Sequence, residues 1–121
     1  MNSVKYEVRV LKTYEESMDY FPKKAQKRIN KKIEEILVKY PYRYNMLKGI
    51  YLLRGISLVG LRKFKTGLEG HRGGVYVLYR ICKECRENGY HQKSGICCEF
   101  CDDGKEYRIV LFFARPRELG Y

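Results

Sequence analysis

Two cysteine pairs in the C-terminal half of the chain have a spacing that is typical of metal sites. Cys82 and Cys85 form one CxxC pair. Cys98 and Cys101 form the second, and twelve residues separate the two pairs. A CxxC turn directs two sulfurs to one side of a tight knuckle, so two such turns can place four thiolates in a tetrahedron around zinc. A site with four sulfur ligands has no open coordination position, and we therefore expect a structural zinc ion rather than a catalytic one.

The same residues allow other arrangements. Cys97 could replace Cys98 by a shift of register, and His91 is a further candidate ligand. Without a metal, the cysteines would be free thiols or form an adventitious disulfide. Residues 82–105, which contain both pairs, include few apolar side chains, so a metal would supply the free energy that orders this segment. Its acidic residues offset its basic ones, which favours contact with a protein over contact with phosphate.

A second group of residues has the chemistry of a phosphate site. Arg62, Lys63 and Lys65 lie in a segment with strand character, and Arg115 lies near the C-terminus. In a strand with a period of two, Lys63 and Lys65 share one face and Arg62 lies on the other. Cations on one face of a sheet can contact phosphate groups of a nucleic acid. The alternative is solvated surface charge, since 25 of the 121 residues are Lys or Arg.

Length and composition limit the class of protein. The chain has 121 residues, 45% of them apolar and 32% charged, as expected for one globular domain over 1–121. The net charge of +11 points to a polyanionic partner, nucleic acid before membrane, although a lysine-rich proteome would also explain it. The sequence contains no apolar stretch of about 18 residues, and its first residues lead us to expect no signal peptide. We therefore expect a cytoplasmic protein with no membrane partner, in which five cysteines do not build a disulfide framework.

Hydrophobic periodicity predicts one strand, two helices and then three strands. Residues 4–11 alternate like a half-buried strand, and Thr13 with Glu16 has the spacing of a capping box for a short helix. Residues 23–40 have apolar side chains at steps of three and four, which predicts a basic amphipathic helix. The later strands are expected at 56–66 with a bulge at Gly60, at 75–81 after a turn over 66–74, and at 106–114. This order predicts an α+β fold with helices on one face of a mostly antiparallel sheet, and residues 82–105 as an insert in the last hairpin.

Three short motifs, in this order along the chain, resemble sequences of the RelE/ParE toxin superfamily. Residues 46–49 (MLKG) are similar to its LKG stretch, and residues 60–67 (GLRKFKTG) to its basic GLRRLRVG-type strand. Residues 75–81 (VYVLYRI) and 108–115 (RIVLFFAR) resemble its YRVIYRI hairpin and closing strand. The resemblance covers nearly the whole chain except for the cysteine segment, which stands where the family has a short turn. It implies the same order of strand, two helices and three strands.

The resemblance implies a toxin that an antitoxin protein neutralises. In the RelE branch the toxin cleaves mRNA on the ribosome without a metal, because the RNA 2′-hydroxyl attacks the adjacent phosphate and leaves a cyclic phosphate. This reaction needs a proton acceptor, a proton donor and positive charge beside the phosphorane. In the ParE branch the toxin poisons DNA gyrase. We expect RNA, the ribosome and an antitoxin as partners.

The resemblance also implies site residues. The implied catalytic residues are Lys63, Lys65, Arg115 and Tyr121, and the implied nucleic-acid-binding residues are Arg62, Arg72, Arg80 and Arg117. Tyr76 departs from the pattern, since the family has an arginine there, and Arg80 or Arg72 is the candidate replacement. Tyr121 ends the chain, so its own carboxylate would lie beside the phosphate.

The missing arginine favours a second hypothesis. In this alternative the protein is a non-catalytic relative that binds nucleic acid or the ribosome and uses the zinc segment to contact a protein. A ParE-like gyrase inhibitor is the third hypothesis. RNA binding with a steep salt dependence but without cleavage would support the non-catalytic alternative.

Overall fold

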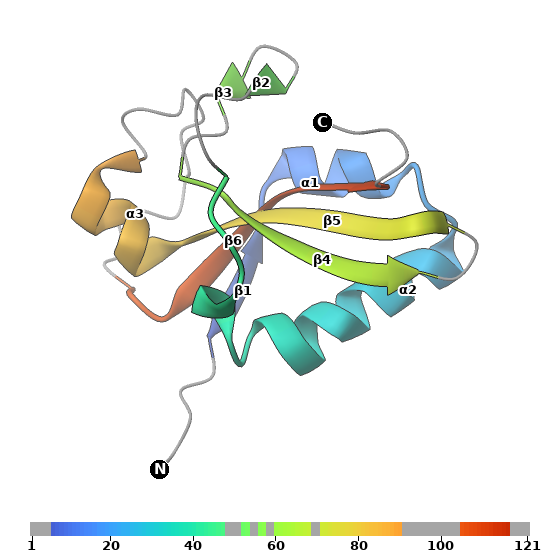
Figure 1. The fold of residues 1–121 in the computed structure, drawn as a ribbon, viewed down its shortest axis with the longest axis horizontal. Coiled ribbons are helices and arrows are strands. Elements are labelled where there is room, and N and C mark those ends of the chain that lie inside the picture. The colour runs from blue at the N-terminus through green and yellow to red at the C-terminus, as the bar shows by residue number, and fades with distance from the viewer. Residues whose placement is uncertain are drawn as a thin grey trace.

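A mixed four-stranded sheet forms the centre of the molecule (Figure 1). The computed structural model describes residues 6–47, 52–53, 56–57, 60–68, 71–90 and 105–116. The strands of the sheet, in the spatial order β1-β6-β5-β4, are β1 (Glu7–Val10), β6 (Arg108–Pro116), β5 (His71–Ile81) and β4 (Arg62–Leu68). β5 is antiparallel to both of its neighbours, whereas β1 runs parallel to β6. The α+β class predicted from the sequence is confirmed.

Helices connect β1 to the later strands and pack on one face of the sheet (Figure 1). They are α1 (Lys12–Met18) and α2 (Lys23–Lys32), followed by a π-helical turn, η1 (Ile33–Leu37), and a short 3-10 helix, η2 (Pro41–Arg43). In the π-helical turn the Val38 N–H donates to the carbonyl of Ile33 at 3.0 Å. The helix expected over 23–40 is therefore present, with a wider last turn. Among the described residues, every helix is too short or too polar to cross a bilayer.

The main core lies between these helices and the sheet. The sheet contributes alternate residues of three strands, all of them buried: Phe64, Val75, Val77, Tyr79, Ile81, Ile109 and Leu111. The helical segment contributes an apolar stripe made of Tyr14, Met18, Phe21, Ile29, Ile33 and Leu37. Since side chains of a strand alternate between its two faces, the residues in between point to the opposite face. A second, smaller apolar cluster forms there around Leu78, Val110 and Phe112.

The first turn of α1 differs from the predicted capping box. Leu11 occupies the cap position with an extended backbone. Thr13 Oγ1 donates to the carbonyl of Phe112 in β6 at 2.9 Å instead of to the start of its own helix. The prediction was wrong because the contact between α1 and the sheet uses the hydroxyl that a local cap would need.

The strand predicted over 56–66 is divided into two parts. β2 (Leu52–Leu53) and β3 (Ile56–Ser57) form a separate antiparallel ladder, and β4 begins after Gly60. Gly60 has a φ of +80°, which other residues rarely adopt, and a Cβ there would come within 2.3 Å of the Tyr90 ring. Gly60 therefore turns the chain between two ladders and does not bulge within one strand.

The turn predicted over 66–74 is shorter than expected. β4 extends to Leu68 and β5 begins at His71, and these two residues are paired. Gly73 and Gly74 lie within β5 with φ values of 82° and 81°. Their positive φ accommodates the register shift between the two strands without ending the ladder.

We predict that Ile29→Ala lowers the free energy of unfolding by about 3 kcal/mol, because Ile29 is fully buried and its loss leaves a cavity between α2 and the sheet. Urea denaturation followed by circular dichroism measures this change. Lys27→Ala, at an exposed position of the same helix, is the control and should change the free energy of unfolding by less than about 0.5 kcal/mol. Equal effects of the two substitutions would contradict the packing of α2 described above.

Candidate nucleic-acid interface

Basic residues from two strands lie on the sheet face that points away from α1 and α2. Lys65 of β4 is paired with Tyr76 of β5, and Tyr76 is paired with Arg115 of β6. Directly opposed residues of neighbouring strands share a face, so these side chains form one line across the sheet. Neighbouring strands are about 4.8 Å apart, which puts the Cα atoms of Lys65 and Arg115 roughly 10 Å apart. Both side chains are long enough to meet at one phosphate above Tyr76.

Lys63 joins this line from two residues earlier in β4. Its Nζ lies 4.6 Å from the centre of the Tyr76 ring, a distance at which an aromatic face attracts a cation. Tyr76 is only 9% exposed, Lys65 is exposed, and Lys63 and Arg115 are half-buried. The ring therefore holds one cation and lies between two others. We call Lys63, Lys65, Tyr76 and Arg115 the cationic row.

A β-bulge in β6 determines that Arg115 belongs to this face. Tyr79 of β5 lies opposite Leu111, but the preceding residue of β5 lies opposite Phe113. Phe112 is therefore an extra residue in β6. Because side chains alternate along a strand, β6 without this extra residue would direct Arg115 toward the helices. The bulge is thus the local feature that completes the cationic row.

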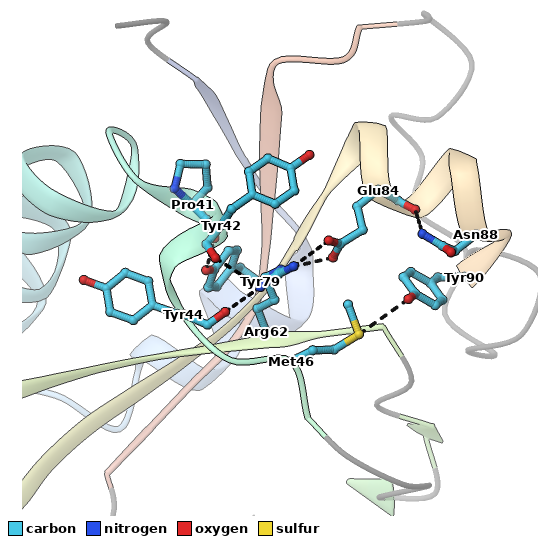
Figure 2. Close-up of polar contacts among 9 residues, drawn as sticks. All are labelled: Pro41, Tyr42, Tyr44, Met46, Arg62, Tyr79, Glu84, Asn88 and Tyr90. Atoms are coloured by element: carbon cyan, nitrogen blue, oxygen red, sulfur yellow. Dashed lines mark hydrogen bonds and ion pairs between the residues drawn. The ribbon is translucent and has the colours of Figure 1, made fainter.

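Arg62 lies on the other face of β4, as the alternation predicts, and belongs to a separate cluster (Figure 2). Its guanidinium forms a bidentate pair of hydrogen bonds with Glu84 of α3 (Cys82–Asn88). Nη2 donates to Oε2 at 2.6 Å and Nε donates to Oε1 at 3.1 Å. Nη1 donates to the carbonyl of Tyr44 at 2.6 Å, and the guanidinium carbon lies 5.3 Å from the Tyr42 ring. The hydrogen bonds to Glu84 raise the pKa of Arg62 above its ordinary value.

This cluster joins three parts of the chain that are distant in sequence: β4, the segment 42–44 and α3. The side chains of Arg62 and Glu84 are 15% and 11% exposed, so the two-pronged bond is largely shielded from water. The charge of Arg62 is thus paired with the carboxylate of Glu84. This pairing does not support the expected contact between Arg62 and nucleic acid. Glu84 was not singled out from the sequence, although a carboxylate inside the CKEC motif, directly after an apolar strand, is the signal that marks it.

Arg80 shares the face of Tyr76, as expected, but it lies in the second apolar cluster. It is 2% exposed, and its guanidinium carbon lies 4.7 Å from the centre of the Phe112 ring. A phosphate at the protein surface would not reach it without displacing this packing. The expectation that Arg80 replaces the family's arginine is therefore not supported by its burial.

The roles assigned to the other basic and tyrosine residues stay predictions, as do the catalytic roles of Lys63, Lys65 and Arg115. Arg72 lies within β5 and not in a turn, because β5 begins at His71. Arg117 and Tyr121 lie outside the described residues, as do Lys48 and Gly49 of the LKG-like motif. Their roles stay predictions.

The first cysteine pair lies in a helix and not in the expected knuckle. Cys82 and Cys85 are 4% and 2% exposed and belong to α3. Residues three apart in a helix point to the same side, so both sulfurs fit one edge of a tetrahedral zinc site. Four further candidate ligands lie outside the described residues: His91, Cys97, Cys98 and Cys101. Within the described ranges no group of three metal-binding side chains occurs.

A comparison with solved structures gives the class of fold. The chain is similar to a chain of the toxin–antitoxin complex RelBE2 from Mycobacterium tuberculosis, with a TM-score of 0.60 and 18% sequence identity. The match covers 96% of this chain and 95% of that chain. No protein-family model and no curated protein matches the sequence. The likeness shows that the protein has a RelE-like fold, in agreement with the order of strands and helices described above.

We predict that Glu84→Gln lowers the free energy of unfolding by about 3 kcal/mol, because it leaves the shielded charge of Arg62 without its carboxylate. Urea denaturation measures the change. The control is Glu87→Gln, one turn further along α3 at an exposed position, which should change stability by less than about 0.5 kcal/mol. If the two substitutions cost the same, the Arg62–Glu84 bond does not attach α3 to the sheet.

Proposed function

We propose that the protein is the toxin of a toxin–antitoxin pair and that it cleaves mRNA on the ribosome with the cationic row. The observation that carries this proposal is the position of Lys63, Lys65 and Arg115 around Tyr76 on one face of a RelE-like sheet. The likeness to a chain of the RelBE2 complex supports the toxin class and an antitoxin partner. The net charge of +11 supports a polyanionic substrate. Because the substrate is mRNA, the site of action is the cytoplasm.

In the proposed reaction the scissile phosphate lies above Tyr76, between Lys65 and Arg115. The RNA 2′-oxygen forms a bond to phosphorus, the bond from phosphorus to the 5′-oxygen breaks, and a 2′,3′-cyclic phosphate remains. The 2′-hydroxyl loses a proton and the 5′-oxygen gains one, so the step consumes no other reactant. Three positive charges offset the extra negative charge of the phosphorane. Lysine and tyrosine side chains at the row are our assignment for the proton acceptor and donor.

We predict that Lys65→Ala and Arg115→Ala each lower the rate of RNA cleavage about 100-fold, because each removes one positive charge from the developing phosphorane. Single-turnover cleavage of mRNA in a purified translating ribosome measures the rate. Lys24→Ala is the matched control, since Lys24 is an exposed cation of α2 on the helix side of the sheet. Loss of cleavage in the control, or full activity of Lys65→Ala, would exclude the cationic row as the site.

A second function follows from Tyr76. The tyrosine at the centre of the row gives Lys63 a fixed position but provides no positive charge. We infer from this that RNA binding without cleavage is the alternative function. In that case single-stranded RNA binds with a log–log salt slope that falls by about 1 when Lys65 or Arg115 is replaced by alanine, and no cyclic phosphate forms.

We also propose a structural zinc site in which Cys82 and Cys85 of α3 act with Cys98 and Cys101. The support from the fold is that both cysteines of α3 are buried and lie on one side of one helix turn. Zinc would bring α3 together with the segment that carries the second pair and would supply folding free energy to a part of the chain with few apolar residues. With four sulfur ligands, the ion would take no part in RNA cleavage.

The zinc proposal predicts one zinc ion per chain after dialysis against a weak chelator, because four thiolates bind zinc tightly at neutral pH. Elemental analysis of the purified protein measures the content. Cys85→Ser should reduce it to about a tenth or less, since three ligands hold the ion far less tightly. Cys97→Ser is the control and should retain the metal. Retention of zinc in Cys98→Ser with loss in Cys97→Ser would show that Cys97 is the ligand in place of Cys98.

A further inference from the structure

The segment 45–47 lies against the outer edge of β4, the edge that does not face β5. Met46 forms an isolated antiparallel bridge with Arg62. The Lys63 N–H donates to the carbonyl of Asn45 at 3.0 Å. Because successive residues of a strand direct their N–H groups to opposite edges, the backbone N–H of Lys63 is bound by this segment and not by β5. One residue of the cationic row therefore depends on the segment 45–47 for this backbone hydrogen bond.

α3 and Tyr90, which follows it closely, support this segment at two points (Figure 2). Glu84 binds and orients the guanidinium of Arg62, which also donates to the carbonyl of Tyr44 at 2.6 Å. The Tyr90 hydroxyl donates to the sulfur of Met46 at 3.5 Å. The two contacts are made by the residues immediately before and after the carbonyl that accepts the hydrogen bond of the lysine. The position of this carbonyl is therefore supported from the side of α3.

The side chain of Lys63 begins at this backbone and ends on the opposite face of β4. Its Nζ lies 4.6 Å from the centre of the Tyr76 ring, within the distance at which an aromatic face attracts a cation. A shift of the backbone changes the direction in which the side chain leaves the strand, and with it the position of the charge. A displacement of about 1 Å at a reacting group can lower a rate about 100-fold. The alignment of Lys63 is thus sensitive to contacts on the far face of β4.

We propose that Glu84 is a positioning residue for Lys63 and that α3 thereby acts on the cationic row. The inference rests on the proposed function, since it concerns the row to which cleavage is assigned. Glu84 does not contact RNA in this role, because it acts through Arg62 and the segment 44–47. α3 also carries the first cysteine pair, so this path connects the cysteine-containing helix to the residues of the proposed reaction.

NMR signals of the folded full chain test the positioning without RNA. Glu84→Gln should at least halve the upfield shift that the Tyr76 ring imposes on the ε-protons of Lys63, and it should weaken the scalar coupling across the hydrogen bond from the Lys63 nitrogen to the Asn45 carbonyl. A loss of stability alone leaves these native-state signals in place. The variant should remain folded, because the Tyr44 ring still packs edge-on against Phe64.

Two further variants accompany this measurement. Glu87→Gln makes the same chemical change at an exposed position of α3 and should leave the Lys63 signals as in the wild type. Arg62→Lys keeps a positive charge beside Glu84 but lacks the planar group that binds this carboxylate and the Tyr44 carbonyl together. It should shift the Lys63 signals in the same direction as Glu84→Gln. The amide spectrum of each variant establishes that it is folded.

Cleavage of mRNA in the purified translating ribosome tests the consequence for the reaction. Glu84→Gln should lower the maximal single-turnover rate about tenfold, because the charge of Lys63 is misplaced in the transition state. The protein concentration that gives half the maximal rate should change less than about threefold, since Lys65 and Arg115 still hold the phosphate. Glu87→Gln should retain both values.

The proposal is wrong if the Lys63 signals of folded Glu84→Gln match those of the wild type, if Glu87→Gln moves them equally, or if they move while the cleavage rate stays the same. Absence of cleavage by the wild-type protein would instead contradict the proposed function. The Lys63 signals would still decide whether Glu84 positions this side chain.

Discussion

The alternation of side chains along three adjacent strands is the constraint on which this molecule depends. One side of β4, β5 and β6 must be apolar to bury α1 and α2, so every second residue is committed to the core. Some of the residues in between form the second apolar cluster, and the others can carry charge. Lys63 and Lys65 flank Phe64 for this reason: the residue that anchors the strand in the core fixes its two neighbours on the opposite face.

α3, the first part of the cysteine-containing insert, is attached to the sheet by an ion pair as well as by the burial of Cys82 and Cys85. The bond between Arg62 and Glu84 connects α3 to β4 one residue before Lys63. Arg62 also binds the carbonyl of Tyr44, so the segment that leads from the helices to the sheet is held at the same point (Figure 2). A charged guanidinium that is mostly excluded from water needs hydrogen-bond acceptors for its N–H groups, and Glu84 and the Tyr44 carbonyl provide them. This requirement fixes the positions of α3 and the segment 42–44 relative to β4.

Positively charged side chains lie on both sides of the sheet. Lys63, Lys65 and Arg115 lie around an aromatic ring on the face that points away from α1 and α2, whereas the cations of α2 lie on the helix side. The three cations of the row and the six of α2 all contribute to the net charge of +11, yet their surroundings differ. Net charge alone therefore does not tell how many anionic partners such a protein has.

The sequence by itself determined the order of the main helices and strands and the two faces of β4, because hydrophobic periodicity is a local property. It predicted the apolar stripe that contains Ile29, the pairing of the two lysines of β4 on one face, and Arg62 on the other. It did not predict that β6 has an extra residue at Phe112, since a bulge depends on the register of two strands that are paired only in the folded chain. That bulge turns Arg115 toward the lysines.

The partners of charged residues were likewise decided only by the tertiary structure. Arg62 and Arg80 are both arginines in strands of one sheet, yet one is bonded to Glu84 and the other packs on Phe112. Each contact joins residues more than twenty positions apart, and its strength depends on how far folding excludes water from the charge. Sequence patterns identify a residue as basic, but only the packed structure determines whether its charge faces solvent, a carboxylate or an aromatic ring.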